Sequence, residues 1–213
     1  KKINPFSNAK QKISDREVNV KVESWLKANG SKPFFMWIHY FDIHSFAKNP
    51  GPWNDISYKG DKRRANQLYD EAVMEFDSNF SILVSHLKKY TDFSQTALFL
   101  TADHGEMLGK KPNFESVSLE SDSGNDTGFY LHGNTLYQDE ITVPLIIKLP
   151  GVEKIHRLED VIRTIDIAPT LLDCIGILKP PNFHGTSIFD IINKTNERKR
   201  EAYMESIYAD KIG

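Results

Sequence analysis

The chain has 213 residues, 39% of them hydrophobic and 26% charged, which is ordinary for a folded globular protein. Its formal net charge of −2 gives no electrostatic reason to expect nucleic acid or an anionic membrane surface as a partner. No apolar stretch approaches the roughly 20 residues that cross a bilayer, so no membrane span is predicted.

The first part of the chain predicts a helix followed by a strand. Residues 1–32 form a polar lead-in, in which 15–26 have a partial apolar face and Gly30 is placed to end the helix. Residues 33–40 are dense in aromatic side chains and predict a buried strand. The loop that follows contains His44 and is long and irregular, as loops that carry function often are.

The middle of the chain contains the clearest helix. Apolar residues recur at three- and four-residue steps over 69–90, with acidic residues near the start and lysines near the end, as the helix dipole favours. The apolar run that follows, ending at residue 103, leads into an Asp-His-Gly motif and predicts a second buried strand. Residues 110–130 are rich in Ser, Asp, Asn and Gly, and we interpret them as a flexible insertion.

The last third supplies two more strands and another helix. Residues 143–148 predict a strand, 166–175 predict a helix capped by Asp166 and ended by Gly176, and 202–206 predict a weaker strand. The overall order predicts an α/β fold with a mostly parallel sheet flanked by helices. In such a sheet, loops that follow the strands meet at one edge, where ligand chemistry gathers.

Four side chains in these loops are candidates for chemistry. Asp103 and His104 offer a carboxylate oxygen and a neutral imidazole, both suitable ligands for one divalent metal. His44 and His132 can bind an anionic substrate or protonate a leaving group. Each has a simpler reading as well, because Asp103 can begin a turn and the histidines can lie in surface loops.

Other kinds of active site find no support in the sequence. Cys174 lies in an apolar helical pattern, and we interpret it as a small buried hydrophobe and not as a nucleophile. The sequence has no Walker-type phosphate loop and no Gly-x-Ser-x-Gly elbow. The absence of these two motifs argues against nucleotide hydrolysis by a P-loop and against a serine hydrolase of the Gly-x-Ser-x-Gly type.

A set of motifs in a fixed order resembles the sulfatase family of the alkaline phosphatase superfamily, over roughly residues 33–207. The set is specific although each piece alone is weak. Its members are Pro33-Phe34-Phe35-Met36-Trp37-Ile38-His39-Tyr40-Phe41-Asp42-Ile43-His44, Tyr69-Asp70-Glu71, Thr101-Ala102-Asp103-His104-Gly105-Glu106, His132-Gly133, Val143-Pro144-Leu145-Ile146-Ile147, Asp166-Ile167-Ala168-Pro169-Thr170 and His184-Gly185-Thr186-Ser187.

The resemblance implies metal-dependent hydrolysis of a sulfate ester, on a small molecule or a glycan, within an alkaline-phosphatase-like fold. Asp103 and His104 match two ligands of the metal, which is most often calcium, with manganese, magnesium and zinc as alternatives. His44 and His132 match positions that contact the sulfate group or assist the leaving oxygen. A periplasmic or secreted location is typical of the family.

Two departures from the family bear on activity. The family's nucleophile is a formylglycine made from Cys or Ser in a Cys/Ser-x-Pro-x-Arg motif, and this sequence contains no such motif. The paired aspartates that complete the metal site are also missing. We therefore expect residues 1–213 to be the C-terminal part of a catalytic domain whose N-terminal part is missing, to lack turnover alone and to bind metal weakly. We expect residues 110–130 to form a flap near the substrate entrance.

Two alternative functions stay open. One is a phosphoryl-transfer member of the same superfamily, such as a phosphodiester or phosphonate hydrolase or a phosphoglycerol transferase. The other is a non-catalytic module that binds anions. The identity of the nucleophile separates the first from a sulfatase, since a threonine in another context indicates phosphoryl transfer.

Overall fold

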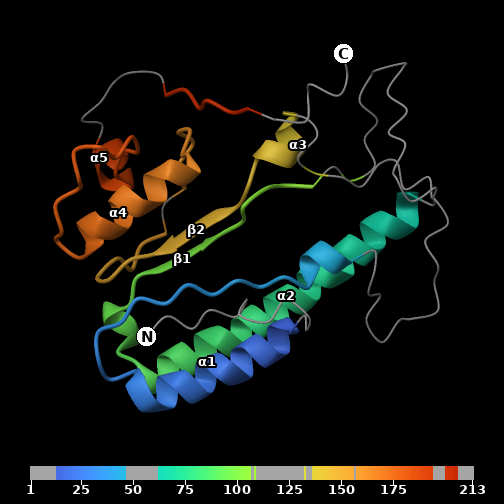
Figure 1. Ribbon diagram of the computed structural model, residues 1–213, viewed down its shortest axis with the longest axis horizontal. Helices are drawn as coiled ribbons and strands as arrows, with labels where there is room; N and C mark the ends of the chain where they lie inside the picture. The colour runs from blue at the N-terminus through green and yellow to red at the C-terminus, as the bar shows by residue number, and fades with distance from the viewer. Residues whose placement is uncertain are drawn as a thin grey trace. The chain divides into compact units, whose positions relative to one another are not determined.

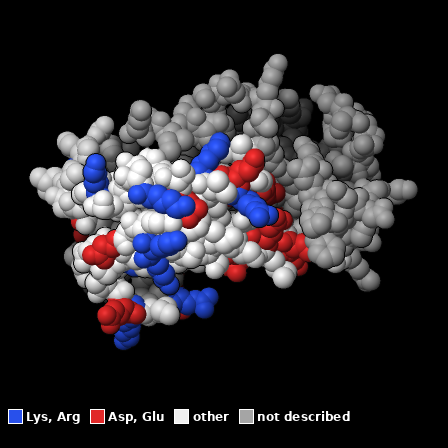
Figure 2. Space-filling view, turned by 90° about the horizontal axis from the view of Figure 1, so that it is seen from below, with Lys and Arg blue, Asp and Glu red and all other residues white. Residues whose placement is uncertain are grey.

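The computed structural model describes residues 13–46, 62–106, 108, 132, 136–155, 157–193 and 200–205. They belong to two compact units, one of Lys1–Phe93 with Glu106–Leu131 and one of Ser94–Gly105 with His132–Gly213. Within the described ranges, no helix has both the length and the apolar composition to cross a bilayer. Figure 2 shows acidic and basic side chains interspersed over the described part of one face, in keeping with the net charge of −2. The predicted insertion at 110–130 and residues 1–12 of the lead-in lie outside the described residues.

Two helices that lie side by side form the body of the first unit (Figure 1). They are α1 (Asp15–Asn29) and α2 (Lys62–Tyr90). Asn19 donates a hydrogen bond to the Asn79 carbonyl at 2.8 Å, and farther along Gly30 packs against the Tyr90 carbonyl. The two residues of each contact are the same number of positions apart in the sequence. A step forward along α1 therefore matches an equal step forward along α2, so α1 and the C-terminal half of α2 run in the same direction. The buried apolar side chains of these helices include Val22, Leu26, Leu83 and Leu87.

The ends of α1 follow signals in the sequence. The Ser14 hydroxyl accepts a hydrogen bond from the Glu17 N–H at 3.3 Å, and the Glu17 carboxylate accepts one from the Ser14 N–H at 2.8 Å. At the other end the Gly30 N–H donates to the Leu26 carbonyl at 2.8 Å. The predicted helix and its stop are confirmed. The predicted helix at 69–90 is also confirmed, but it begins at Lys62, before the apolar periodicity sets in.

Residues 33–41 run back along the helices as an extended segment that the structure does not assign to a strand. The Tyr40 ring meets the Phe76 ring edge-on at 5.6 Å. The even-numbered side chains from 34 to 40 are partly covered, whereas Phe35 is 75% exposed and Trp37 is 81% exposed. Successive side chains of extended backbone point to opposite faces. The prediction of a buried strand here was wrong, because the helices cover only one of these faces.

The second unit contains a two-stranded sheet, with β1 (Leu98–Thr101) and β2 (Leu145–Lys148) inside two of the predicted strands. The strands pair antiparallel, with Leu98 opposite Lys148 and Thr101 opposite Leu145. The predicted parallel orientation is therefore wrong for this pair, and the described residues do not confirm a mostly parallel sheet. Parallel neighbours need a long crossover, usually a helix. Between these strands the structure describes only the one-turn helix α3 (Gln138–Ile141).

Three short helices complete the second unit: η3 (Thr164–Asp166), α4 (Ile167–Cys174) and α5 (Ile188–Ile192). The Thr170 hydroxyl donates to the Asp166 carbonyl at 2.6 Å and accepts from the Ile188 N–H at 3.0 Å, which joins α4 to α5. The predicted stop of α4 is confirmed, since Gly176 has a φ of +69° and the Ile177 N–H bonds the Leu172 carbonyl at 2.9 Å. Residues 202–205 are not a strand, against the prediction for 202–206, and residue 206 is outside the described part.

Candidate functional site

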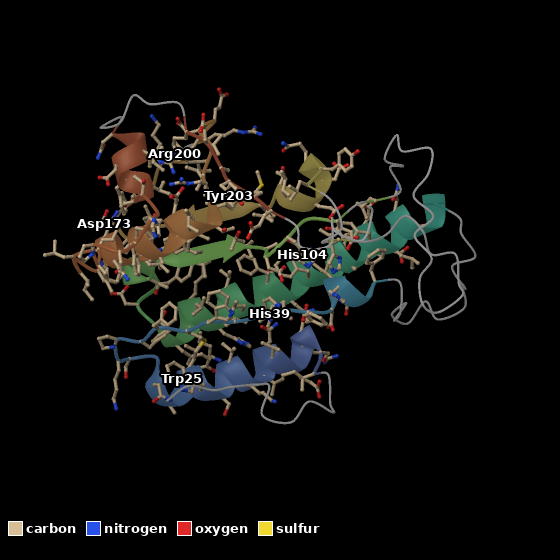
Figure 3. All side chains as sticks on the ribbon, turned by 45° about the horizontal axis from the view of Figure 1, so that its top comes forward. Trp25, His39, His104, Asp173, Arg200 and Tyr203 are labelled. Carbon is tan, nitrogen blue, oxygen red and sulfur yellow. The ribbon has the colours of Figure 1, made fainter. Side chains whose placement is uncertain are left out.

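The candidate metal ligands lie directly after β1, as the sequence predicted for a loop at the end of a strand. β1 ends at Thr101, and Asp103 and His104 follow in irregular backbone. Figure 3 labels His104 beyond the end of that strand. The side chain of Asp103 is 75% exposed and that of His104 is 37% exposed. Both groups are therefore open to an ion or a substrate from solvent.

A hydrogen bond fixes the form of the His104 ring. Nδ1 of His104 lies 2.7 Å from the carbonyl oxygen of Gly105. Because a carbonyl only accepts, Nδ1 of the neutral ring carries the proton and Nε2 keeps its lone pair. Asp103 Oδ1 accepts the His104 backbone N–H at 3.0 Å and lies 3.8 Å from Nε2. A carboxylate oxygen and an imidazole lone pair thus lie close together.

His132 is the third candidate at this position. Its ring stacks on the ring of His104, with centroids 3.9 Å apart and planes inclined by 22°. The two residues are far apart in sequence, and the tertiary structure brings their rings into contact. Asp103, His104 and His132 together form what we call the histidine pair site.

The loop that carries this site is held against α3. The Gly105 N–H donates to the Glu140 carbonyl at 2.7 Å. A Cβ at position 105 would collide with the backbone carbonyl of Asp139, so this contact requires glycine. The sequence motif Asp-His-Gly therefore joins two candidate ligands to the residue that anchors them.

Replacing Gly105 with alanine is expected to lower the free energy of unfolding by about 1 to 3 kcal/mol, because the new methyl group displaces α3 or the loop. The change is measured by urea denaturation followed by circular dichroism. The His104 ring signals in NMR are expected to move as well, because the ring is bonded to the Gly105 carbonyl. A variant with unchanged stability and unchanged ring signals would contradict this contact.

His44 lies in the first unit, whereas Asp103, His104 and His132 lie in the second. It is the middle residue of the 3₁₀ turn η1 (Ile43–Ser45) and is exposed. Its ring stacks on that of Phe41, with centroids 4.4 Å apart and planes inclined by 15°. The ring is thus presented on a short turn with an aromatic support.

The histidine pair site fits part of a metal centre. Ligand bonds of about 2.0 to 2.6 Å allow two atoms 3.8 Å apart to share one divalent cation. A metal-bound histidine commonly donates its other ring N–H to a carbonyl, as His104 does to Gly105. Among the described residues no group of three or more Asp, Glu, His or Cys side chains could hold a metal. Asp103 and His104 are therefore suited to serve as two members of a larger ligand set.

Cys174 does not have the surroundings of a reactive thiol. It is the last residue of α4 and is partly buried. Burial, together with the negative charge of Asp173, raises the pKa of its thiol. A raised pKa leaves less thiolate at neutral pH, which weakens the residue as a nucleophile.

Two contacts of the candidate residues were not predicted from the sequence. One is the hydrogen bond by which the Gly105 carbonyl orients His104. The other is the stacking of Phe41 on His44. The glycine directly after the histidine and the aromatic residue three positions before His44 were the available signals.

The sequence is similar to proteins of one known family. The family model described as Sulfatase matches residues 1–177. Arylsulfatase K of Mus musculus is 24% identical over 182 residues, which are 85% of this chain and 28% of that protein. Arylsulfatase K of Homo sapiens is 24% identical over 143 residues, 66% of this chain and 24% of that protein.

A further relative is the extracellular sulfatase SULF-1 homolog of Drosophila melanogaster, 23% identical over 143 residues, which are 67% of this chain and 11% of that protein. The chain thus spans about a quarter of the length of the arylsulfatase K relatives.

Proposed function

The chain belongs to the sulfatase family, and from that membership we propose that the protein containing it hydrolyses sulfate esters with a divalent metal. Family membership also implies an alkaline-phosphatase-like α/β fold. The observation that carries the proposal is the histidine pair site, where the Asp103 carboxylate and His104 Nε2 lie 3.8 Å apart and His132 stacks on the same ring.

Asp103 and His104 are the residues of this chain that would hold the metal, with calcium as the favoured ion. When bound, the metal supplies positive charge that offsets the negative charge of a sulfate ester and of its transition state. Gly105 keeps the His104 ring in the form that leaves Nε2 free of a proton. This orientation holds the ligand atom ready and lowers the cost of ordering it.

His132 and His44 are proposed to act on the substrate itself. A ring N–H of His132 donates a hydrogen bond to a sulfate oxygen, while stacking on His104 fixes the ring plane. His44 delivers a proton to the ester oxygen of the leaving group, from a ring held by Phe41. In this proposal His132 binds the negatively charged sulfate group, and His44 transfers the proton.

The remaining parts of the active site are proposed to lie in sequence other than these 213 residues. The chain has no Cys/Ser-x-Pro-x-Arg motif to become a formylglycine, and it supplies only two of the proposed ligands. It also covers 28% of mouse arylsulfatase K. We therefore expect the 213-residue chain alone to show no turnover and only weak metal binding. Sulfatase activity of this chain alone would overturn that expectation.

The test compares sulfate and phosphate esters of the same aryl alcohol, using the full gene product that contains this chain with added calcium. We expect the sulfate ester to be cleaved at least about 100-fold faster, and a chelator to abolish cleavage. Asp103→Asn is expected to weaken calcium binding and activity together. A preference for the phosphate ester would identify the phosphoryl-transfer alternative instead, and tight sulfate binding without cleavage of either ester would identify an anion-binding module.

A matched control is available on the second unit. His184 is exposed and has no place in the proposed site. His184→Ala is expected to keep wild-type rates, whereas His132→Ala is expected to lose about 100-fold in kcat/KM. Equal rates for these two variants would remove His132 from the proposed mechanism.

A further inference from the structure

We propose that Asp15 is a positioning residue for His44, acting through the backbone of residues 41 and 42. The proposal rests on the proposed role of His44 in sulfate ester hydrolysis. Asp15 is the first residue of α1, and it is 1% exposed. Burying a carboxylate costs free energy unless it is well hydrogen-bonded, so its partners indicate what it stabilises.

The partners of Asp15 lie directly before the turn that carries His44. Its Oδ1 accepts hydrogen bonds from the backbone N–H of Phe41 at 2.8 Å and of Asp42 at 3.3 Å. In return, Asp42 Oδ2 accepts the Asp15 N–H at 2.8 Å. These reciprocal bonds, which we call the Asp15–Asp42 clasp, fix the backbone at the entry to η1.

The start of α1 does not require the Asp15 side chain for capping. Ser14 is the N-cap residue, and it forms a capping box with Glu17. An exposed acidic residue in a first turn already interacts favourably with the helix dipole, so this interaction does not require the burial of Asp15. The Asp15 carboxylate is instead buried and turned toward residues 41 and 42, far away in sequence.

The turn is also fixed at its other end. The Phe46 N–H donates to the Ile43 carbonyl at 3.0 Å, and the buried Phe46 ring meets the Tyr69 ring of α2 edge-on at 5.4 Å. His44 stacks on Phe41, whose N–H Asp15 holds. Loss of the clasp would free the entry to the turn and the aromatic support of His44 together.

Nearby, burial and then the charge of Asp15 raise the pKa of the Tyr40 hydroxyl well above its usual range. This hydroxyl donates to Asn19 at 2.5 Å, so it stays protonated next to the carboxylate. The segment that leads into η1 is therefore bonded to α1 at residues 40, 41 and 42.

The test uses Asp15→Ala, Asp15→Asn and the control Val22→Ala. Val22 is buried in the same helix and makes no part of the clasp, so its truncation lowers stability without freeing η1. Asparagine keeps the Oδ1 acceptor for both N–H groups. In the 213-residue chain, we expect Asp15→Ala to shift the His44 ring signals in NMR, identified by their loss in His44→Gln, while Asp15→Asn and Val22→Ala leave them in place.

In the full gene product, we expect Asp15→Ala to lower kcat about 10- to 100-fold with KM nearly unchanged, because a misplaced acid slows the chemical step more than binding. Asp15→Asn is expected to restore most of kcat, and Val22→Ala to keep it. Should Asp15→Ala not fold, Asp15→Ser makes the same comparison, since its hydroxyl is too short to replace the carboxylate.

Unchanged His44 signals in Asp15→Ala, or an equal loss of kcat in Val22→Ala, would overturn the proposal. The two proposals fail in distinguishable ways. If His44→Ala keeps full activity, the catalytic role of His44 is wrong, whereas a shifted ring signal in Asp15→Ala still supports positioning.

Discussion

Replacing Asp166 with alanine is expected to lower the free energy of unfolding of the chain by about 3 to 5 kcal/mol. The Asp166 side chain is 0% exposed and accepts hydrogen bonds from three residues. Arg163 donates from Nη2 at 2.9 Å, from Nε at 3.3 Å and from its backbone N–H at 2.9 Å. Arg200 donates from Nη2 at 2.5 Å, and Thr186 donates its backbone N–H at 2.8 Å. Alanine leaves two largely buried guanidinium groups without their carboxylate, which is the costly way to break a buried ion pair.

Urea denaturation followed by circular dichroism measures this loss, with Asp173→Ala as the matched control. Asp173 is an exposed acid on α4, the helix that begins directly after Asp166, and Figure 3 labels it together with Arg200. Its replacement is expected to change the free energy of unfolding by less than about 0.5 kcal/mol. Similar losses for the two variants would show that the Asp166 ion pairs contribute no special stability.

The same carboxylate makes stability depend on pH. Burial opposes the ionisation of Asp166, but the Arg163 side chain and the Thr186 N–H outweigh it and hold the pKa below its ordinary value. A group with a lower pKa in the folded state stabilises the fold above its unfolded-state pKa of about 4 and loses that contribution as pH falls through the folded-state pKa.

The urea concentration at the unfolding midpoint of the wild-type chain is therefore expected to decrease as the pH is lowered below about 4. We expect the midpoint of Asp166→Asn to depend less steeply on pH, because this variant has no carboxylate to protonate at position 166. Parallel curves for the two proteins would contradict this assignment.

Replacing His104 with alanine is expected to reduce kcat/KM for sulfate esters by about 100- to 1,000-fold in the full gene product. The change removes the Nε2 ligand atom beside Asp103 and also the ring on which His132 stacks. Calcium affinity, measured by titration calorimetry, is expected to fall in the same variant. An effect on activity without any change in calcium affinity would place His104 outside the metal site.

Local elements of this fold could be predicted from the sequence. The capping signals at Ser14 and Gly30 and the long apolar periodicity gave α1 and α2, and the short apolar runs gave β1 and β2. Each of these signals involves residues close together in the sequence, so it can be recognised in a single sequence. The boundary of α2 was predicted less well, because its first residues lack the apolar pattern.

The relative orientation of the strands and the burial of the aromatic side chains were predicted less well. The apolar composition of β1 and β2 is compatible with parallel or antiparallel pairing, and only the hydrogen-bond register shows that they are antiparallel. The aromatic segment at 33–40 was predicted to be buried, yet Trp37 is 81% exposed. Composition indicates a preference for burial, whereas the available neighbours decide which face is covered.

The sequence by itself singled out the candidate site residues, since Asp103, His104, His132 and His44 stand in motifs whose order resembles one family. Only the tertiary structure stacked His132 on His104, set Nε2 of His104 beside the Asp103 carboxylate and bonded Asp15 to the backbone before His44. The physical reason is that side-chain type is fixed by the sequence, but the ring stacking and the hydrogen bonds of Asp15 require groups distant in sequence to meet. That meeting depends on how helices and strands pack, which no local pattern specifies.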